Sequence, residues 1–252
     1  ELGGRIIDFL EIHGFDTKDI QVDPVHPTGT VQIIMNPGKS HDFHINENAA
    51  YDHIVWDRQL QKLAGRQWEL FYFGSLIQRN DNNAVLIQQL LAQRQPSATR
   101  FCDINLRKNC YSKSSVDACM GSADILKLNH EELMTICSKD LTVKADDLMA
   151  KKVMAAYDIH QLILTRGAGG STWYGPGDHK VVSASNPSSA VQDTVGAGDA
   201  FAAVSAAGIL RGLPVPHILS FASQFALKIC ETQGAIPDDK DLYQYYQRRL
   251  EA

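Results

Sequence analysis

The residues with the clearest potential for chemistry lie in the stretch 193–201, which reads DTVGAGDAF. Gly196 and Gly198 flank the small Ala197 and leave the backbone N–H groups unshielded, directly before a segment with helical spacing. The first turn of a helix has N–H groups without intrahelical partners and carries the positive end of the helix dipole. The pattern therefore predicts an anion-binding bend, most naturally for a phosphate.

Asp199 follows this bend directly, although a carboxylate would repel a phosphate bound beside it. It has a chemical role if it faces a second substrate and accepts the proton of a hydroxyl that attacks the phosphoryl group. The alternative is that Asp199 only favours the N-terminus of the helix, as acidic residues often do. Spacing alone leaves both interpretations open.

The stretch 193–201 closely resembles the C-terminal signature of the ribokinase-like, or PfkB, family of carbohydrate kinases. The resemblance implies that Asp199 is the catalytic base. It also implies that the amides of Gly196, Ala197 and Gly198 form the anion hole for the transferring γ-phosphate of ATP.

A second motif similar to the family concerns a metal. Residues 129–132 (NHEE) directly follow the apolar run 125–128 and resemble the N-x-x-E motif. In the family this pair organises Mg²⁺ and its water shell, and hard oxygen ligands suit that cation. The resemblance therefore implies a magnesium role for Asn129 and Glu132. The alternative is that the two residues only cap the helix that follows.

The nucleotide side of the family is also represented. Residues 165–170 (TRGAGG) resemble the T-x-G-x-x-G loop that lines the nucleotide site, although a turn between strands would also use such glycines. Residues 222–237 resemble the segment that closes over adenine, with a serine where many members carry an asparagine. The nucleotide-binding residues implied by the resemblance are Thr165, Gly167, Gly170, Asn129 and Ser223.

Two further resemblances concern the substrate and a monovalent cation. Residues 101–107 (FCDINLR) look like the D-x-N-x-R segment of the fructokinase and ketodeoxygluconate kinase branches, which implies that Asn105 and Arg107 face the sugar side. An arginine paired on the surface is the alternative. Asp193 and the Val195 carbonyl resemble a site for K⁺, although an aspartate before a tight loop often bonds its own backbone.

Taken together, the family resemblance implies an ATP-dependent kinase that phosphorylates a hydroxyl of a small sugar, fructose first, with Mg²⁺ and in many members K⁺. Ketodeoxygluconate kinase, ribokinase and nucleoside kinase are alternatives, and a noncatalytic nucleotide-binding protein is an alternative of another class. The resemblance also implies a homodimer formed through a β lid. Family members begin with a strand that bears a sugar-binding aspartate and with a Gly-Gly motif, and we expect residue 1 to follow both.

The loops that carry these motifs follow apolar runs of strand length, which alternate with segments of helical spacing. This order predicts a parallel sheet with crossover helices, whose ligands bind beyond the carboxyl ends of the strands. With the resemblance, it predicts a three-layer α/β/α sandwich with a mostly parallel central sheet and a small β lid, forming one ribokinase-like domain over residues 1–252. Strands are expected at 69–73, 100–104, 125–128, 161–165 and 180–183, and helices at 5–13, 83–94, 143–157, 198–210, 216–232 and 241–250.

The lid is expected in the first part of the chain. Runs rich in β-branched residues at 30–35 and 41–45 flank the Pro-Gly turn signal at 36–40, and this pattern predicts a hairpin. The resemblance assigns the lid to about residues 19–46 and the nucleotide-binding half to about residues 123–252.

Composition excludes several other classes of protein. The 252 residues carry 24 Lys and Arg against 29 Asp and Glu, a net charge of −5 without a basic run, which argues against a nucleic-acid partner. Every apolar stretch is broken before about 18 residues, which argues against a membrane span. The five cysteines are odd in number, with no pair at the spacing of metal or redox motifs. They predict reduced thiols in a cytoplasmic protein.

Overall fold

The computed structural model describes residues 1–35, 41–93, 97–137, 145–184 and 190–251. It divides into two compact units, and the chain passes between them more than once. The first unit consists of Glu1–Trp68, Phe73–Ala98 and Leu106–Ser122, and the second of Glu69–Tyr72, Thr99–Asn105 and Ala123–Ala252.

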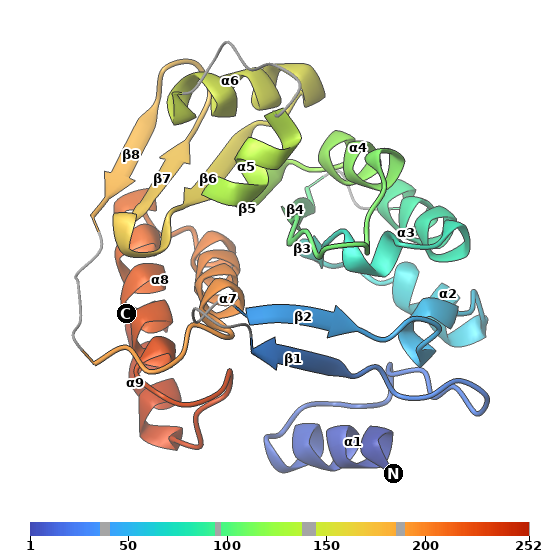
Figure 1. Cartoon of the computed structure of the whole chain (residues 1–252). Helices are drawn as coiled ribbons and strands as arrows, with labels where there is room; N and C mark the ends of the chain where they lie inside the picture. Colours follow the sequence, from blue (N-terminus) through green and yellow to red (C-terminus); the bar gives the residue numbers. More distant parts are fainter. Residues whose placement is uncertain (36–40, 94–96, 138–144, 185–189, 252) are drawn as a thin grey trace. The chain divides into compact units, whose positions relative to one another are not determined.

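The second unit is built on a six-stranded sheet with the strands in sequence order (Figure 1). Neighbouring strands are parallel from β4 to β6, β7 is antiparallel to β6, and β8 is antiparallel to β7. Because β8 therefore runs in the direction of β6, β7 is the only reversed strand between β4 and β8. The strands are β3 (Leu70–Phe73), β4 (Thr99–Asp103), β5 (Ile125–Asn129), β6 (Gln161–Thr165), β7 (Ser171–Tyr174) and β8 (Lys180–Ser183).

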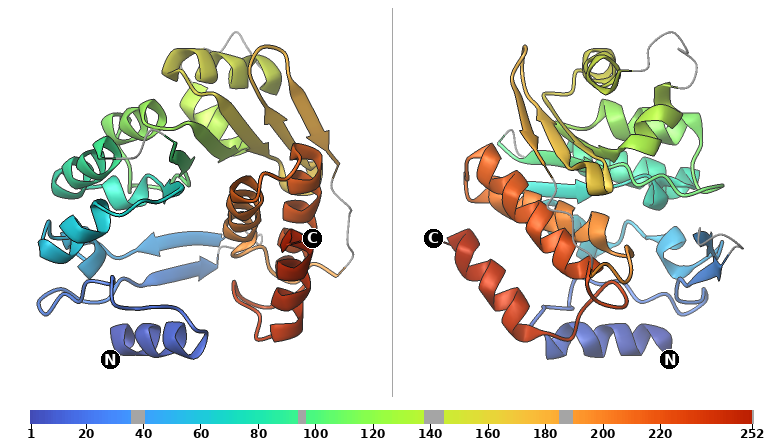
Figure 2. Two further views of the ribbon diagram at one scale, coloured as in Figure 1. Left: turned by 180° about the vertical axis from the view of Figure 1, so that it is seen from behind. Right: turned by 60° about the vertical axis from the view of Figure 1, so that its left-hand side comes forward.

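Helices cover both faces of this sheet (Figure 2). Helices α5 (His130–Cys137) and α6 (Asp146–Tyr157) pack against β5 and β6, respectively. Helices α7 (Ala197–Leu210), α8 (Val215–Cys230) and α9 (Lys240–Glu251) lie on the other face. The second unit is thus the expected three-layer α/β/α sandwich with a mostly parallel sheet.

The layers form because side chains on a strand alternate between the two faces of the sheet. Phe101, Ile125, Ile163 and Trp173 point to one face, where they join a buried cluster with α7, α8 and Tyr246 of α9. The intervening strand residues face the other layer. Burial of such apolar side chains contributes about 25 cal/mol per Å² removed from water, which holds both helical layers on the sheet.

The first unit carries the predicted hairpin, in which β1 (Val31–Met35) and β2 (His41–Ile45) pair antiparallel. The Pro-Gly turn expected at 36–40 lies outside the described residues. The other elements of this unit are α1 (Leu2–Ile12), η1 (Ala50–His53), α2 (Arg58–Ala64), η2 (Leu76–Gln78), α3 (Asp81–Ala92) and α4 (Lys113–Gly121).

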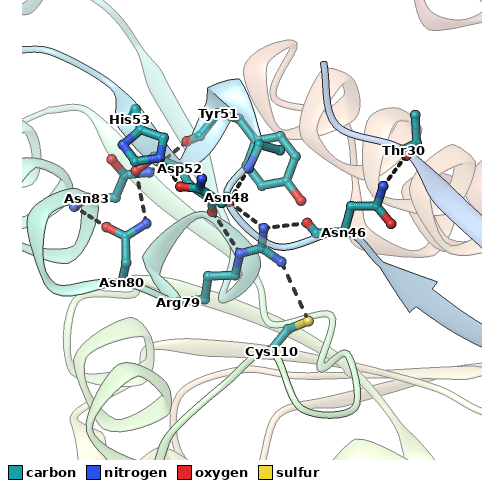
Figure 3. A network of polar contacts seen from close by, with 11 residues as sticks. Thr30, Asn46, Asn48, Tyr51, Asp52, His53, Arg79, Asn80, Asn83 and Cys110 are labelled. Carbon is teal, nitrogen blue, oxygen red and sulfur yellow. Dashed lines mark hydrogen bonds and ion pairs between the residues drawn. The ribbon is translucent and has the colours of Figure 1, made fainter. Parts of the chain in front are cut away.

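A buried ion pair ties the first unit together around Arg79 (Figure 3). Its Nε donates to Oδ1 of Asp52 at 2.7 Å, one of its terminal nitrogens donates to the Asn46 carbonyl at 2.7 Å, and its guanidinium lies over the Tyr51 ring. The two charged side chains are only 9% and 6% exposed. Arg79 thus joins the end of the β2 segment, η1 and the segment that leads into α3.

Most predicted elements are confirmed within one to three residues. The sequence-based prediction missed β7, α2 and α4, and it gave no bounds for the helix after Asn129, which is α5. All five cysteines are described, and none of them forms a disulfide in the structure. Among the described helices, none has the length and apolar character needed to cross a bilayer.

Candidate active site

The N-terminus of α7 has the sharp bend that the two glycines predict. Gly196 caps the helix in a left-handed conformation, with φ of 82°. A Cβ at this position would lie 2.7 Å from Cβ of Ala235, so the bend needs glycine for two independent reasons. The N–H of Ala197 makes a long hydrogen bond of 3.3 Å to the Thr194 carbonyl, and the Gly196 carbonyl accepts the first bond of the helix from Ala200.

The two glycines of the bend differ in what they tolerate. We expect Gly196→Ala to lower the melting temperature by at least about 4 °C, because a left-handed conformation costs a residue with a Cβ about 1–2 kcal/mol and the methyl also clashes. Gly198→Ala should leave the melting temperature unchanged or raise it, because alanine favours a helix and the new Cβ would meet, among the described atoms outside this helical turn, only Nζ of Lys127 at 3.9 Å. Differential scanning calorimetry of both variants measures the two melting temperatures. An equal fall in both would contradict the prediction.

Asp199 lies in the first turn of α7, and its side chain is exposed on the second unit. The position is compatible with both interpretations of its role. A carboxylate here interacts favourably with the helix dipole, and it is also accessible to a substrate. The exposed placement meets the first requirement for a general base.

The carboxyl ends of the parallel strands place two other predicted residues side by side. Asn129 on β5 and Thr165 on β6 are register partners. By the alternation of strand residues, both lie on the face of the sheet that carries Ile125 and Ile163, which is the α7 face. Asn129 and Glu132 also form a reciprocal cap on α5. The Asn129 N–H donates to Oε2 of Glu132 at 2.7 Å, and the Glu132 N–H donates to Oδ1 of Asn129 at 2.9 Å. The capping role is therefore present, and a magnesium role would be additional to it.

The loop 165–170 is a turn between the antiparallel strands β6 and β7. Gly167 and Gly170 both have positive φ, at 52° and 81°, and the Arg166 N–H donates to the Gly170 carbonyl at 2.8 Å. Arg166 also binds Asp146 of α6 at 2.6 Å, which fixes the loop to the α5 and α6 layer. The glycines thus have a structural role whether or not the loop contacts a nucleotide.

Asp193 bonds its own loop, as the alternative interpretation predicts. Its Oδ1 accepts from the Val195 N–H at 3.0 Å, and its Oδ2 accepts from the Gly234 N–H at 3.3 Å. The second bond reaches across to the segment that also packs against Gly196. Asp193 therefore connects the bend to residues 234–235.

The remaining predicted residues lie on other elements. Ser223 is half-buried on α8. Asn105 follows β4 with a positive φ of 42° and belongs to the second unit, whereas Arg107 belongs to the first.

The structure adds three residues that the sequence-based prediction did not select. Lys127 on β5 lies opposite Asp103 on β4 in the parallel register, and its Nζ donates to Oδ2 of Asp103 at 2.8 Å. The hydroxyl of Tyr72 on β3 donates to the same oxygen at 3.1 Å. Desolvation, and then the charge of Asp103, raise the pKa of Tyr72 well above its usual value, so this hydroxyl stays protonated.

A signal for these residues is present in the sequence. The run Ile125–Leu128 is apolar except for Lys127, and a lysine inside a buried strand must have a partner of opposite charge. Asp103 supplies that partner from the neighbouring strand. The second unit therefore combines an amide-rich helix N-terminus with polar side chains near the carboxyl ends of parallel strands, an arrangement typical of α/β proteins that bind phosphorylated ligands.

The comparison with known families identifies the class of enzyme. A model described as the pfkB family carbohydrate kinase matches residues 1–241. The chain belongs to this family and is an ATP-dependent carbohydrate kinase. A sugar kinase of Pyrococcus horikoshii is 25% identical over 262 residues, which cover 98% of this chain and 77% of that protein.

Solved structures agree on the fold. The ATP complex of the uncharacterized sugar kinase from Pyrococcus horikoshii superimposes with a TM-score of 0.78 at 23% identity, covering 98% of this chain and 80% of that one. Fructokinase from Vibrio cholerae, solved with fructose, ADP and calcium, has a TM-score of 0.75 at 21% identity, covering 97% and 81%. At these identities the matches establish the ribokinase-like fold and leave the substrate open.

Proposed function

We propose that this sugar kinase transfers the γ-phosphoryl group of ATP to a primary hydroxyl of fructose, with Asp199 as the general base. The observation that carries this proposal is the geometry at the start of α7. The glycine bend at 196–198 and the exposed carboxylate of Asp199 are adjacent at the start of one helix. This adjacency supports the proposal that the bend binds the phosphate while Asp199 accepts the proton of the second substrate.

In the proposed transfer step, the sugar hydroxyl gives its proton to the Asp199 carboxylate, and its oxygen forms a bond to the γ-phosphorus. The bond from that phosphorus to the bridging oxygen breaks, and ADP leaves with the electron pair. The amides of the bend and the dipole of α7 stabilise the negative charge on the γ-phosphoryl oxygens.

The residues present fit a magnesium ion that contacts the protein through water. Within the described ranges no group of three His, Cys, Asp or Glu side chains could form a protein cage for a metal. Mg²⁺ does not need one, because it keeps several waters and binds through few carboxylates together with substrate phosphates. Asn129 and Glu132 would hold it from the end of β5, and the ion would offset phosphate charge. The reciprocal cap fixes both side chains in advance.

A monovalent cation at Asp193 would have to share the carboxylate with hydrogen bonds that are already present. Both carboxylate oxygens of Asp193 already accept backbone N–H groups, from Val195 and Gly234. Each oxygen has a second lone pair, and the Val195 carbonyl is near in sequence. We propose that K⁺, where it acts, binds there and stiffens the bend beside Gly196.

We also propose that the two units act as one kinase domain, with the hairpin β1–β2 as the lid over the sugar. The family match from residue 1 to residue 241 spans both units and supports this. Exclusion of water by such a lid would favour transfer to sugar over hydrolysis of ATP.

A panel of phosphoryl acceptors tests the substrate. The full-length protein is incubated with ATP, Mg²⁺ and K⁺ and with fructose, 2-keto-3-deoxygluconate, ribose or adenosine, and both ADP and the phosphorylated product are quantified. We expect the highest kcat/KM for fructose. A higher value for another acceptor would replace fructose as substrate. Tight binding of ATP without any phosphorylated product would favour the noncatalytic nucleotide-binding alternative.

A further inference from the structure

Lys127 is a buried cation inside the sheet. The residue is 5% exposed, and its Asp103 partner is 3% exposed. A buried ion pair contributes little net stability compared with apolar residues of the same volume, because both charges lose their hydration. Stability alone therefore gives a weak reason for placing a lysine in this strand.

The position of the ammonium group relative to α7 suggests another reason. A Cβ built on Gly198 would lie 3.9 Å from Nζ of Lys127, and no other described atom outside that turn of α7 comes within 4 Å of this point. The Asp103 carboxylate is farther from Gly198 than the ammonium is. The positive end of the ion pair thus lies next to the side-chain position of Gly198, inside the bend.

Asp103 is itself held in place by a second donor. Tyr72 donates to the same Oδ2 that accepts from Lys127, and its ring stacks on Phe101. The charge of Asp199 also contributes to the raised pKa of Tyr72, which places that hydroxyl within electrostatic reach of the proposed base. Asp103 therefore holds Tyr72 and Lys127 through one oxygen, and Lys127 lies beside the side-chain position of Gly198.

We infer that Lys127, oriented by Asp103, supplies fixed positive charge beneath the bend at 196–198 and makes this site selective for the terminal phosphate of ATP. The inference rests on the proposed function of the bend. Lys127 acts through the electrostatic potential at the bend, so it is a positioning residue whose effect depends on how much phosphate charge the ligand places there. A cation held in a site of low dielectric needs no reorganisation when the anion arrives.

Two variants remove the positive charge of Lys127 and differ in what they leave on Asp103. Lys127→Gln keeps a donor for Asp103, and Lys127→Met with Asp103→Asn replaces the ion pair by a neutral pair. Binding of AMP-PNP and of AMP is measured by calorimetry, together with kcat and the melting temperature. We expect the ratio of the two affinities to fall at least about tenfold, with AMP binding nearly unchanged, and kcat to fall by a similar factor.

A matched control removes a different ion pair, between β4 and the residue that precedes β5. Arg100 and Asp124 pair at 2.7 Å at the opposite end of β4, away from the carboxyl edge. Arg100→Met with Asp124→Asn should leave the affinity ratio at the wild-type value, since this pair lies far from the bend along the strand. A comparable fall in the control would show that any lost ion pair in the sheet has this effect, and would overturn the inference.

Failure of the inference and failure of the proposed function have different signatures. If wild-type protein phosphorylates no acceptor and binds AMP-PNP no more tightly than AMP, the proposed function is wrong. If wild type is active and the folded Lys127 variants keep its affinity ratio and kcat, only the inference is wrong. Loss of folding in both variants would identify a structural ion pair and would overturn the inference as well.

Discussion

Replacement of Asp199 by Asn should lower kcat at least about a hundredfold while ATP still binds. A general base contributes roughly 10² to 10⁴ in rate, and asparagine keeps the size of the side chain but cannot accept the proton of the attacking hydroxyl. Steady-state production of phosphorylated sugar measures the loss. The change removes one negative charge beside the anion site, so the affinity for nucleotide should be retained or slightly improved.

The matched control is Asp241→Asn at the start of α9. Asp241 is likewise an exposed acidic residue in the first turn of a helix, so its replacement removes the same favourable interaction with a helix dipole, about 0.3–1 kcal/mol. We expect full activity in this variant. If Asp199→Asn changes stability as Asp241→Asn does and keeps wild-type turnover, Asp199 only stabilises its helix.

Replacement of Arg79 by Met should destabilise the first unit by about 3–5 kcal/mol, because it leaves the Asp52 carboxylate buried without its cation. For a chain of this size that corresponds to a fall of at least about 6 °C in melting temperature. The control is Arg66→Met, which breaks an ion pair with Asp19 whose side chains are 48% and 26% exposed. That pair should contribute less than about 1 kcal/mol. Similar losses of melting temperature in both variants would contradict the claim that the buried ion pair contributes more stability than the exposed one.

The Arg79 effect should depend on pH. Burial raises the pKa of Asp52, but hydrogen bonds from Arg79 and from the Ala49 N–H outweigh it and hold the pKa below 3.8. In wild type this carboxylate therefore stabilises the fold above about pH 4, and the contribution is lost as the pH falls through the lowered pKa. Without Arg79, burial favours the protonated acid. The difference in melting temperature between wild type and Arg79→Met should therefore be smaller at pH 4 than at pH 7. Thermal unfolding of both proteins at the two pH values measures this difference.

The periodicity of the sequence was enough to predict the layers of the second unit. The apolar strand 161–165 and the amphipathic helix α8 have clear patterns that tertiary packing does not override. The missed strand β7 is short and follows a run of glycines, and its STWY sequence mixes polar and aromatic residues that are all buried. Its pairing with β6 and β8 satisfies its backbone, and single-sequence patterns do not report such partners.

The sequence predicted the part of the candidate site that consists of residues close together in the chain. The bend at 196–198 depends on neighbours in sequence, apart from the close approach of Ala235. The pairing of Lys127 with Asp103 depends on the register of two strands separated by a crossover through the first unit. Neither residue alone indicates this register, so the sequence reveals a lysine that needs a partner but not the partner itself.

The central claim, that Asp199 accepts the proton while the bend beside it holds the phosphoryl group, is tested most directly by a single-turnover experiment. Wild type and Asp199→Asn are mixed in excess over ATP with saturating fructose, quenched on the millisecond scale, and assayed for fructose phosphate, with ATP affinity measured on the same preparations. We expect ATP affinity in the variant equal to or tighter than in wild type, and a transfer rate at least about a hundredfold lower. Equal transfer rates would contradict the claim.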